Sequence, residues 1–323
     1  MTKSLGGFKD KIKICAIVGP TACGKSDLAI WLAREINAEI VSADSMQIYK
    51  GMDIGTAKPT LADRSLVTHH MIDFLDPKQS FSVAEYVREA NFAIEGVVLR
   101  KKRPILVGGT GLYIDSLLDG IEFCEQKTDP EIRKRLFDDL EKFGAEHMFN
   151  RLKALDFEYA QNIHPNNTKR VIRGLEICLL TGLNVSENMR LSRKKKTHFD
   201  SLRIGLTFSD RKKLYKKIDD RVDYMIDRGL IQEARKFFDQ KELFSTSAQA
   251  IGYKEFWDFF LGKQSLDEAI SKIKQNTRKY AKRQLTWFRK DRRIHWIYCD
   301  DMCEEKRKNK VMELVKRHFE IKL

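Results

Sequence analysis

The sequence predicts an α/β protein built on a doubly wound parallel sheet, with an all-helical domain inserted into it. Short, almost wholly apolar runs alternate with long helical patterns, which is typical of strands covered by helices on both faces. A glycine-rich loop joins the first apolar run to the first helical pattern. A stretch from 121 to 200 holds helical patterns only, so we expect it to interrupt the sheet-forming sequence.

The apolar runs identify the strands in chain order. Five segments are predicted as strands: 12–18, 39–43, 105–108, 204–208 and 294–298. Their near-continuous hydrophobicity and short length favour buried strands over helices. The sheet core is therefore expected from residues 1–120 and 201–323, and the helical insertion from 121–200.

Several helix ends can be located from capping residues. Ser82 with Glu85, and Ser265 with Glu268, have the spacing at which each side chain caps the other's backbone donor. In the insertion, Asp129–Pro130 is expected to begin a helix that Gly144 ends, and Gly182 to end another. The segment 302–319 is predicted as a charged C-terminal helix.

Composition excludes several classes of protein. The 323 residues include 42% hydrophobic residues, enough for a large core, and no apolar run approaches the roughly 18 residues of a membrane helix. The six cysteines are scattered, unlike a secreted disulfide scaffold, so we expect reduced thiols and a cytoplasmic protein without membrane contact. The net charge is +14, and residues 201–323 carry +11 of it.

The excess positive charge is concentrated in residues 263–293, where 11 basic residues meet three acidic ones. Tyr280, Trp287 and Phe288 lie among them. Basic residues that displace counterions, with aromatic faces that stack on bases, suit a nucleic acid. The alternative is a solvated amphipathic helix whose aromatic residues pack into the core.

The strongest motif follows the first predicted strand and matches the phosphate-loop pattern G-x-x-x-x-G-K-[ST]. It consists of Gly19, Pro20, Thr21, Ala22, Cys23, Gly24, Lys25 and Ser26. Backbone amides and the helix N-terminus can hold phosphate oxygens, Lys25 can neutralise an outer phosphate, and Ser26 can reach Mg²⁺. We therefore predict a phosphate-loop NTPase-like core that binds a phosphorylated substrate and Mg²⁺.

A carboxylate follows the second predicted strand. The 105–108 strand ends in glycines and Thr110, without the aspartate by which nucleotide hydrolases usually support Mg²⁺, whereas 39–43 leads directly to Asp44. The carboxyl ends of strands form the sites of doubly wound folds, so Asp44 should face the phosphate loop. From its position alone it is a metal ligand, a general base or the cap of a turn.

Eight motifs together resemble one known family over residues 12–298. They are GPTACGKS (19–26), SADSMQIYKGMDIGTAKP (42–59), HHMIDFLDP (69–77), FSVAEY (81–86), VGGTGLY (107–113), HPNNTKRVIRGLE (164–176), AIGYKE (250–255) and AKRQLTWFR (281–289). Their order and spacing are similar to those of the bacterial tRNA dimethylallyltransferase family. The resemblance implies transfer of a dimethylallyl group from dimethylallyl diphosphate to N6 of the adenine beside the anticodon, position 37, with release of diphosphate.

The resemblance also implies roles for particular residues. Asp44 corresponds to the catalytic base and Thr110 to a residue at the reacting centre, while Arg221 joins the phosphate loop in holding the diphosphate. The helical insertion corresponds to a tRNA-binding domain. Because the sequence has no obvious coiled-coil or sheet-edge signal, we also expect the protein to act as a monomer. Residues matching the family's tRNA contacts are Asp44, Ser45, Met46, Gln47, Thr110, Arg133, Lys169, Arg170, Val171, Ile172, Arg173, Gln249, Ala250, Ile251, Gly252, Tyr253 and Lys254. Lys282 and Arg283 of the basic stretch are expected to hold the tRNA backbone electrostatically.

Three other functions compete with this interpretation. An adenylate dimethylallyltransferase would act on free AMP, ADP or ATP, but the helical insertion and the basic C-terminal third are superfluous for so small an acceptor. A phosphate-loop kinase would leave the basic and aromatic stretch unused. A non-enzymatic RNA-binding module would not need an intact phosphate loop with Asp44 and Thr110.

Overall fold

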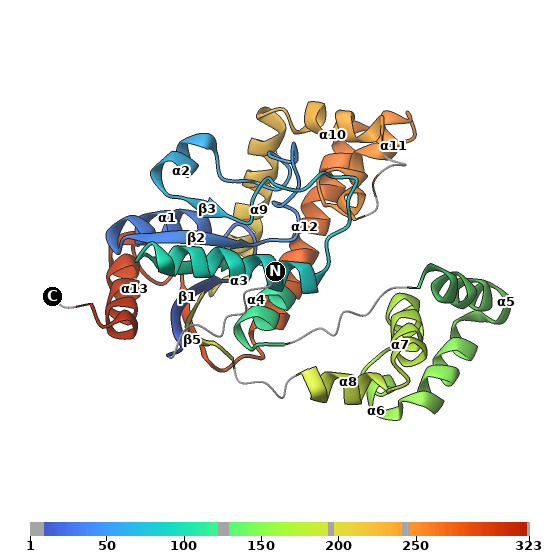
Figure 1. Cartoon of the computed structure of the whole chain (residues 1–323). Helices are drawn as coiled ribbons and strands as arrows, with labels where there is room; N and C mark the ends of the chain where they lie inside the picture. The colour runs from blue at the N-terminus through green and yellow to red at the C-terminus, as the bar shows by residue number, and fades with distance from the viewer. Residues whose placement is uncertain (1–9, 122–128, 193–196, 241–243, 245, 322–323) are drawn as a thin grey trace. The chain divides into compact units, whose positions relative to one another are not determined.

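The chain divides into two compact units. The structure, a computed structural model, describes residues 10–121, 129–192, 197–240, 244 and 246–321. One unit combines Met1–Leu118 with Thr197–Leu323, and the other is Asp119–Lys196 (Figure 1). Each unit is described below by itself.

The first unit is built on a six-stranded, wholly parallel sheet. Its strands are β1 (Ile12–Val18), β2 (Ala38–Ala43), β3 (His69–His70), β4 (Arg103–Gly108), β5 (Phe199–Thr207) and β6 (Ile294–Tyr298). They lie in the order β3-β2-β4-β1-β5-β6. The predicted α/β class is confirmed, and all five predicted strands are present, with β5 beginning five residues earlier than expected.

The edge strand β3 was not predicted. It is only two residues long, and its residues His69 and His70 pair with Ile40 and Val41 of β2. Two half-buried histidines have neither the length nor the hydrophobicity that identifies a strand from sequence. The pairing depends on the neighbouring strand and so could not be read locally.

Helices cover both faces of the sheet. The helices α1 (Lys25–Glu35) and α13 (Glu304–Phe319) pack on one face, and α3 (Val83–Leu99) and α4 (Gly111–Leu118) pack on the other. Apolar side chains of β1 alternate between these two cores, with Cys15 and Ile17 toward one and Ile14 and Ala16 toward the other. This alternation confirms burial of the central strand on both sides.

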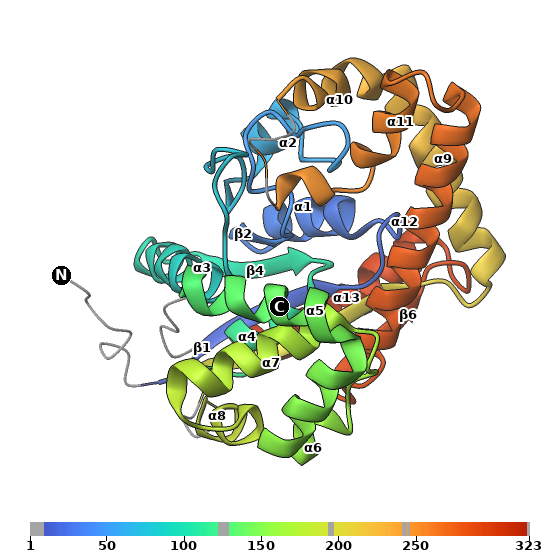
Figure 2. The ribbon, with the colours of Figure 1, turned by 90° about the vertical axis from the view of Figure 1, so that its right-hand side faces the viewer.

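A third apolar cluster supports the loops above the sheet. It joins α9 (Arg211–Asp227), α10 (Leu230–Phe238) and α12 (Leu266–Phe288) to the segment around Ile48–Met52. Figure 2 shows α9, α10 and α12 beside one another at this end of the unit. The shorter helices of the unit are α2 (Leu61–Leu66), η2 (Ser247–Gln249), η3 (Lys254–Phe256) and α11 (Trp257–Phe260).

The predicted capping boxes are present at α3 and α12. The Ser82 and Ser265 hydroxyls accept from the backbone of Glu85 and Glu268, whose carboxylates accept in return. Thr60 and Asp63 form a third box at α2 that was not predicted. The predicted C-terminal helix is α13.

The second unit is helical throughout its described part. Its helices are α5 (Pro130–Leu155), α6 (Phe157–Ala160), α7 (Thr168–Thr181) and α8 (Val185–Ser192). Gly144 interrupts α5 with φ 81° and ψ 171°, so the helical stretch that begins after Asp129 ends there, as predicted, and a second continues beyond it. Gly182 ends α7 in the left-handed conformation. Within the described ranges of the whole chain, no helix is both long and apolar enough to cross a membrane.

Candidate active site

The candidate site lies at the carboxyl edge of the sheet, where the loops after β1, β2 and β4 meet. Strand β4 pairs with both β1 and β2, and Gly108 is in register with Val18 and with Ala43. Strands β1 and β2 are consecutive in the chain, but β4 lies between them in the sheet. Such a change of strand order opens a crevice outside the carboxyl ends of the strands.

The phosphate loop curves between β1 and α1. Gly19 has φ 138°, and a Cβ there would meet the carbonyl oxygen of Leu206 at 2.2 Å. Gly24 caps α1 in the left-handed conformation, with φ 81°. The ammonium group of Lys25 donates to the Pro20 carbonyl at 2.6 Å, so the side chain lies along its own loop. These features place backbone amides and a cation around one point at the helix N-terminus.

Cys23 serves the loop through its backbone. Its side chain is 4% exposed, and Sγ donates to the Pro20 carbonyl at 2.9 Å. Burial raises the pKa of this thiol, and the nearby charges of Lys25 and Arg221 lower it by less. The side chain is therefore a neutral packing group rather than a nucleophile.

Asp44 and Thr110 are held together by the turns that carry them. Asp44 Oδ1 accepts from the backbone of Met46 at 2.8 Å and of Gln47 at 3.3 Å. Thr110 Oγ1 accepts from the backbone of Ser45 at 3.1 Å, and its own N–H donates to the Ala43 carbonyl at 3.1 Å. The two predicted catalytic residues thus share one hydrogen-bonded corner.

Arg221 of α9 reaches the same place from the other side of the crevice. Burial lowers the pKa of its guanidinium, while the Asp44 carboxylate acts in the opposite direction, followed by Cys23 and Asp27. The side chain lines cavities that also contain Asp44, Lys25 and Ser26. The cation is therefore available to an anion at the phosphate loop.

Asp44 lines two connected subsites. A small cavity of about 80 Å³ contains Lys25, Ser26 and Gly109 beside Asp44. A larger cavity of about 370 Å³ extends from Asp44 toward α9 and α12 and is in the size range of small-molecule sites. The carboxylate therefore stands between the phosphate-binding loop and a space large enough for an acceptor.

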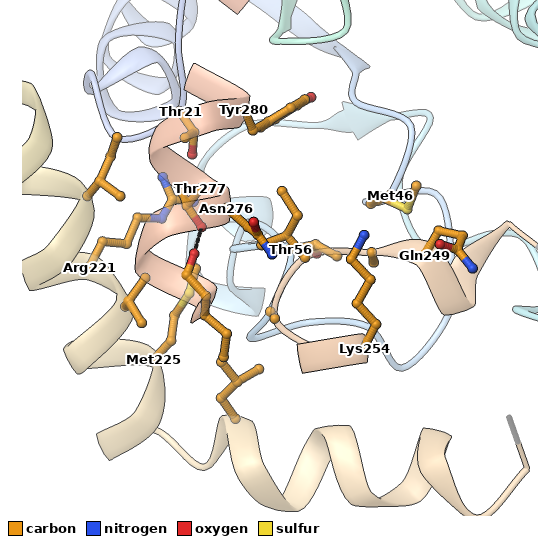
Figure 3. Close-up of a pocket in the computed structure, with 18 of the residues that line it drawn as sticks. Thr21, Met46, Thr56, Arg221, Met225, Gln249, Lys254, Asn276, Thr277 and Tyr280 are labelled. Carbon is orange, nitrogen blue, oxygen red and sulfur yellow. Dashed lines mark hydrogen bonds between the residues drawn. The ribbon is translucent and has the colours of Figure 1, made fainter. Parts of the chain in front are cut away.

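The larger cavity has one wall on α9 and α12 and another on loops (Figure 3). Arg221, Thr277 and Asn276 lie on the helix side, whereas Met46, Gln249 and Lys254 lie opposite. The remaining apolar part is formed by Ile218, Val222, Met225, Leu230, Ile251 and Ile273. Such a mixture suits a ligand with both an aromatic or aliphatic body and polar edges.

Two carboxylates, the half-buried Glu233 and the buried Glu255, fix the loop wall, and neither was predicted. Glu233 accepts from the backbone N–H groups of Asp53, Ile54 and Gly55 at 2.9–3.0 Å and from the Tyr253 hydroxyl at 2.6 Å. Glu255 accepts from Gly252 N and from the Asn276 amide, each at 2.9 Å. Glu233 acts on residues about 180 positions away, so no local pattern signals it. Glu255 joins the nearby Gly252 to Asn276 on α12, and in the sequence it was visible only as part of AIGYKE.

The structure brings many of the predicted tRNA-contacting residues to the larger cavity. Its lining includes Asp44, Ser45, Met46, Gln249, Ala250, Ile251, Gly252, Lys254 and Arg283. Gln47 lines the smaller cavity, and its amide donates to the Thr56 and Ala57 carbonyls at 3.2 Å. Tyr253 is an exception, because it is 1% exposed and its hydroxyl is directed to Glu233. Its side chain supports the loop and is not accessible to RNA.

The predicted tRNA contacts in the helical unit are likewise of two kinds, exposed and buried. Arg133, Lys169 and Arg170 are exposed. Val171 and Ile172 are 1% and 2% exposed, and pack in the apolar core of that unit. Their side chains are therefore unavailable to RNA, because the amphipathic helix α7 turns them inward. Arg173 is half-buried and pairs with the buried Glu176 at 2.8 Å.

The basic stretch on α12 combines both interpretations made from the sequence. Lys282 and Arg283 are exposed, while Phe288 is 2% exposed in the core. Trp287 is partly exposed and donates to Asp115 at 2.7 Å. One face of the helix is thus a solvated basic surface, and its aromatic residues mainly pack inward.

Ser26 is the predicted magnesium ligand, and it lines the smaller cavity beside Lys25 and Asp44. Among the described residues, no group of three histidine, cysteine or carboxylate side chains could hold a metal by itself. Mg²⁺ commonly keeps several waters and binds through few protein ligands together with substrate phosphates. A single hydroxyl at the loop fits that mode of binding.

Two family descriptions match the sequence. One described as IPP transferase matches residues 47–291, and one described as isopentenyl transferase matches residues 12–73. A tRNA dimethylallyltransferase of Halothermothrix orenii is 46% identical over 291 residues, 90% of this chain and 88% of that protein. The enzyme of the same name from Bacillus subtilis is 46% identical over 287 residues, 89% of this chain and 91% of its own length.

Solved structures agree with these relatives. The full-length tRNA isopentenylpyrophosphate transferase of Bacillus halodurans superposes with a TM-score of 0.72 at 41% identity, covering 96% of this chain and 97% of that one. A eukaryotic dimethylallyltransferase, studied acting on tRNA, has a TM-score of 0.79 at 31% identity and covers 94% of this chain and 80% of its own.

Proposed function

The chain belongs to the IPP transferase family, and from this premise we propose that it is a tRNA dimethylallyltransferase acting on N6 of adenine 37. The observation that carries the proposal is the position of Asp44, between the cavity beside the phosphate loop and the larger cavity. An electrophile held by the loop and a base entering from the larger cavity would meet at this carboxylate.

In the proposed reaction, the N6 lone pair of adenine attacks C1 of dimethylallyl diphosphate. The C1–O bond breaks, and its electron pair leaves with the diphosphate. Loop amides, Lys25 and Arg221 stabilise the negative charge that grows on that leaving group, where fixed donors are most effective. Burial of Arg221 strengthens this attraction because less water screens it.

The acceptor requires a base, since the adenine amino group shares its lone pair with the ring. Asp44 takes the N6 proton as the N–C bond forms and passes it to solvent. Its Oδ1 is held by two backbone N–H groups, which orients the carboxylate without neutralising it. Thr110, tied to Ser45 in the same corner, orients the amine or the diphosphate.

Ser26 and the diphosphate oxygens would hold Mg²⁺. The bound ion supplies charge neutralisation for the leaving group. Among the residues described, the lack of a multidentate protein cage is consistent with a metal that arrives with the substrate.

The tRNA is proposed to enter from the side of the larger cavity. Adenine 37 would be turned out of the anticodon loop to reach Asp44, as enzymes that modify a stacked base require. The exposed Lys282 and Arg283 would attract the phosphate backbone, and Arg133, Lys169 and Arg170 of the helical unit would add further contacts. The enzyme is proposed to act as a monomer in the cytoplasm, where its tRNA substrate is found.

The direct test is transfer of label from radioactive dimethylallyl diphosphate, with Mg²⁺, into unmodified tRNA and in parallel into AMP and ATP. We expect label in tRNA that is lost when adenine 37 is replaced. Label only in free nucleotides would instead establish an adenylate dimethylallyltransferase. Label in none of these acceptors would contradict prenyl transfer and favour a kinase or an RNA-binding module.

A further inference from the structure

Gln284 of α12 occupies an unusual position within the basic stretch. Its neighbours Lys282 and Arg283 are exposed, whereas Gln284 is 5% exposed and points toward the sheet edge. Its Oε1 accepts from the backbone N–H of Thr21 at 2.9 Å, and its Nε2 donates to the Gly109 carbonyl at 3.0 Å. One primary amide thus satisfies a buried donor and a buried acceptor from two different loops.

The two loops carry opposite halves of the site. Thr21 belongs to the phosphate loop, and Gly109 immediately precedes Thr110, which is bonded to the turn of Asp44. Because the Thr21 N–H is directed to Gln284, this amide is engaged by protein rather than by phosphate. The glutamine therefore spans the distance between the group that would hold the diphosphate and the corner that would receive the adenine.

The fit around this amide is close. A Cβ on Gly109 would lie 2.0 Å from Nε2 of Gln284, so any larger residue must displace the amide. Tyr280, one turn earlier on α12, lies beside the same groups: burial raises the pKa of its hydroxyl, and the side chains of Thr110 and Gln284 act in the opposite direction. The amide of Gln284 therefore has little room to move between the helix and the Gly109 loop.

We propose that Gln284 is a positioning residue that sets the spacing between the phosphate loop and the Asp44–Thr110 corner. The inference rests on the proposed function and adds to it a role for Gln284, a residue of the smaller cavity's lining, that is exerted through the two loops it joins. The primary amide presents an acceptor and a donor on two separate atoms; an ionised carboxylate lacks the donor, and an aliphatic chain lacks both. Misplacement of reacting groups by about 1 Å can cost about 100-fold in rate.

The test is a double-mutant cycle on transfer of dimethylallyl to tRNA. Gln284→Ala should lower kcat by about 10- to 100-fold, in keeping with a loss of alignment rather than of binding. Gly109→Ala should lower kcat by a similar factor, because its methyl group displaces the same amide. In the double variant, Gly109→Ala should cost little beyond Gln284→Ala alone, because the side chain it displaces has been removed.

Three further measurements separate alignment from folding. Binding of tRNA without the prenyl donor should stay within about twofold of the parent, since Gln284 is buried beneath the RNA-facing side chains. Gln284→Glu retains the acceptor for Thr21 and lacks the donor for Gly109, so it should also transfer slowly. Gln275→Ala, an exposed glutamine on the same helix, is the control and should transfer normally.

The inference is overturned if Gln284→Ala transfers at the parent rate, if the two substitutions multiply independently, or if tRNA binding and turnover fall together. The last result would mean that the glutamine supports α12 generally. If the parent protein transfers nothing to tRNA, the proposed function fails instead, so the two failures are distinguishable.

Discussion

The phosphate loop and the loop wall of the larger cavity are held in place by different means. In the phosphate loop, Gly19 and Gly24 adopt positive φ, and strand register brings the loop beside Gly108. In the loop wall, the segment Asp53–Gly55 is held by the distant carboxylate of Glu233. The glycine conformations follow from local sequence, whereas the position of Asp53–Gly55 depends on a side chain about 180 residues away.

This difference separates the loop that would hold the reacting diphosphate from the loops that would contact the RNA. A loop whose curvature is set by its own glycines suits the constant diphosphate, with Gln284 proposed to set only its distance from the Asp44–Thr110 corner. A loop held by side chains can be altered by one substitution, which suits the recognition of a variable RNA. The following predictions test that contrast.

The largest effect is expected at Asp44, which lines both the cavity beside the phosphate loop and the larger cavity. Asp44→Asn keeps the side-chain shape and removes the base, so kcat should fall by roughly 10²- to 10⁴-fold. Binding of tRNA should remain nearly unchanged, because one carboxylate contributes little to the affinity for a polyanion. The measurement is single-turnover transfer together with filter binding. The exposed Asp267→Asn is the matched control, and turnover of Asp44→Asn at its rate would exclude Asp44 as the base.

The next effect is expected at the loop wall. Glu233→Gln replaces one acceptor oxygen of the carboxylate by a donor that faces backbone N–H groups, and should lower the free energy of unfolding by about 2–3 kcal/mol. The KM for tRNA should rise by about tenfold, with a smaller effect on the KM for dimethylallyl diphosphate. Denaturant unfolding and steady-state kinetics check both parts. Equal changes in the two KM values would show that the phosphate loop and the loop wall are not independent.

Substitution of two glycines tests the same contrast through the free energy of unfolding. At Gly24 a Cβ meets open space but φ is +81°, so Gly24→Ala should cost about 1–2 kcal/mol of unfolding free energy through backbone strain. At Gly55 a Cβ would lie 2.5 Å from the Tyr253 ring, so Gly55→Ala should cost about 1–3 kcal/mol through crowding. Only the second cost should shrink in a Tyr253→Ala background, as thermal unfolding of the single and double variants can show.

The smallest effect concerns the outer surface of α12. Replacing Lys282 and Arg283 by alanine should reduce the slope of log K for tRNA binding against log salt concentration. The reduction should be at most about 1.4, given about 0.7 per single-stranded phosphate contact. Binding measured across a range of salt concentrations gives this slope. The control replaces Lys306 and Lys310, two exposed lysines of α13. An unchanged slope for the first pair would place the RNA elsewhere.

Much of this protein could be predicted from its sequence because the relevant signals are local. The strands are apolar runs, α3 and α12 begin at serine–glutamate pairs, and the phosphate loop requires its glycines at fixed spacing. Residues whose role depends on burial were harder to predict from the sequence. Val171, Ile172 and Tyr253 lie in motifs matched to RNA contacts, yet the structure turns all three side chains inward.

The sequence by itself determined the α/β class, the phosphate loop and the identity of Asp44 as the carboxylate beside it, because each rests on residues within one turn or one strand. Tertiary structure alone decided the strand order, the edge strand β3 and the supports Glu233 and Gln284. The physical reason is that a buried hydrogen bond needs both partners in place, and its partner can lie anywhere in the chain. Glu233 reaches Asp53–Gly55, and Gln284 reaches Thr21 and Gly109, only after the sheet and its helices have assembled.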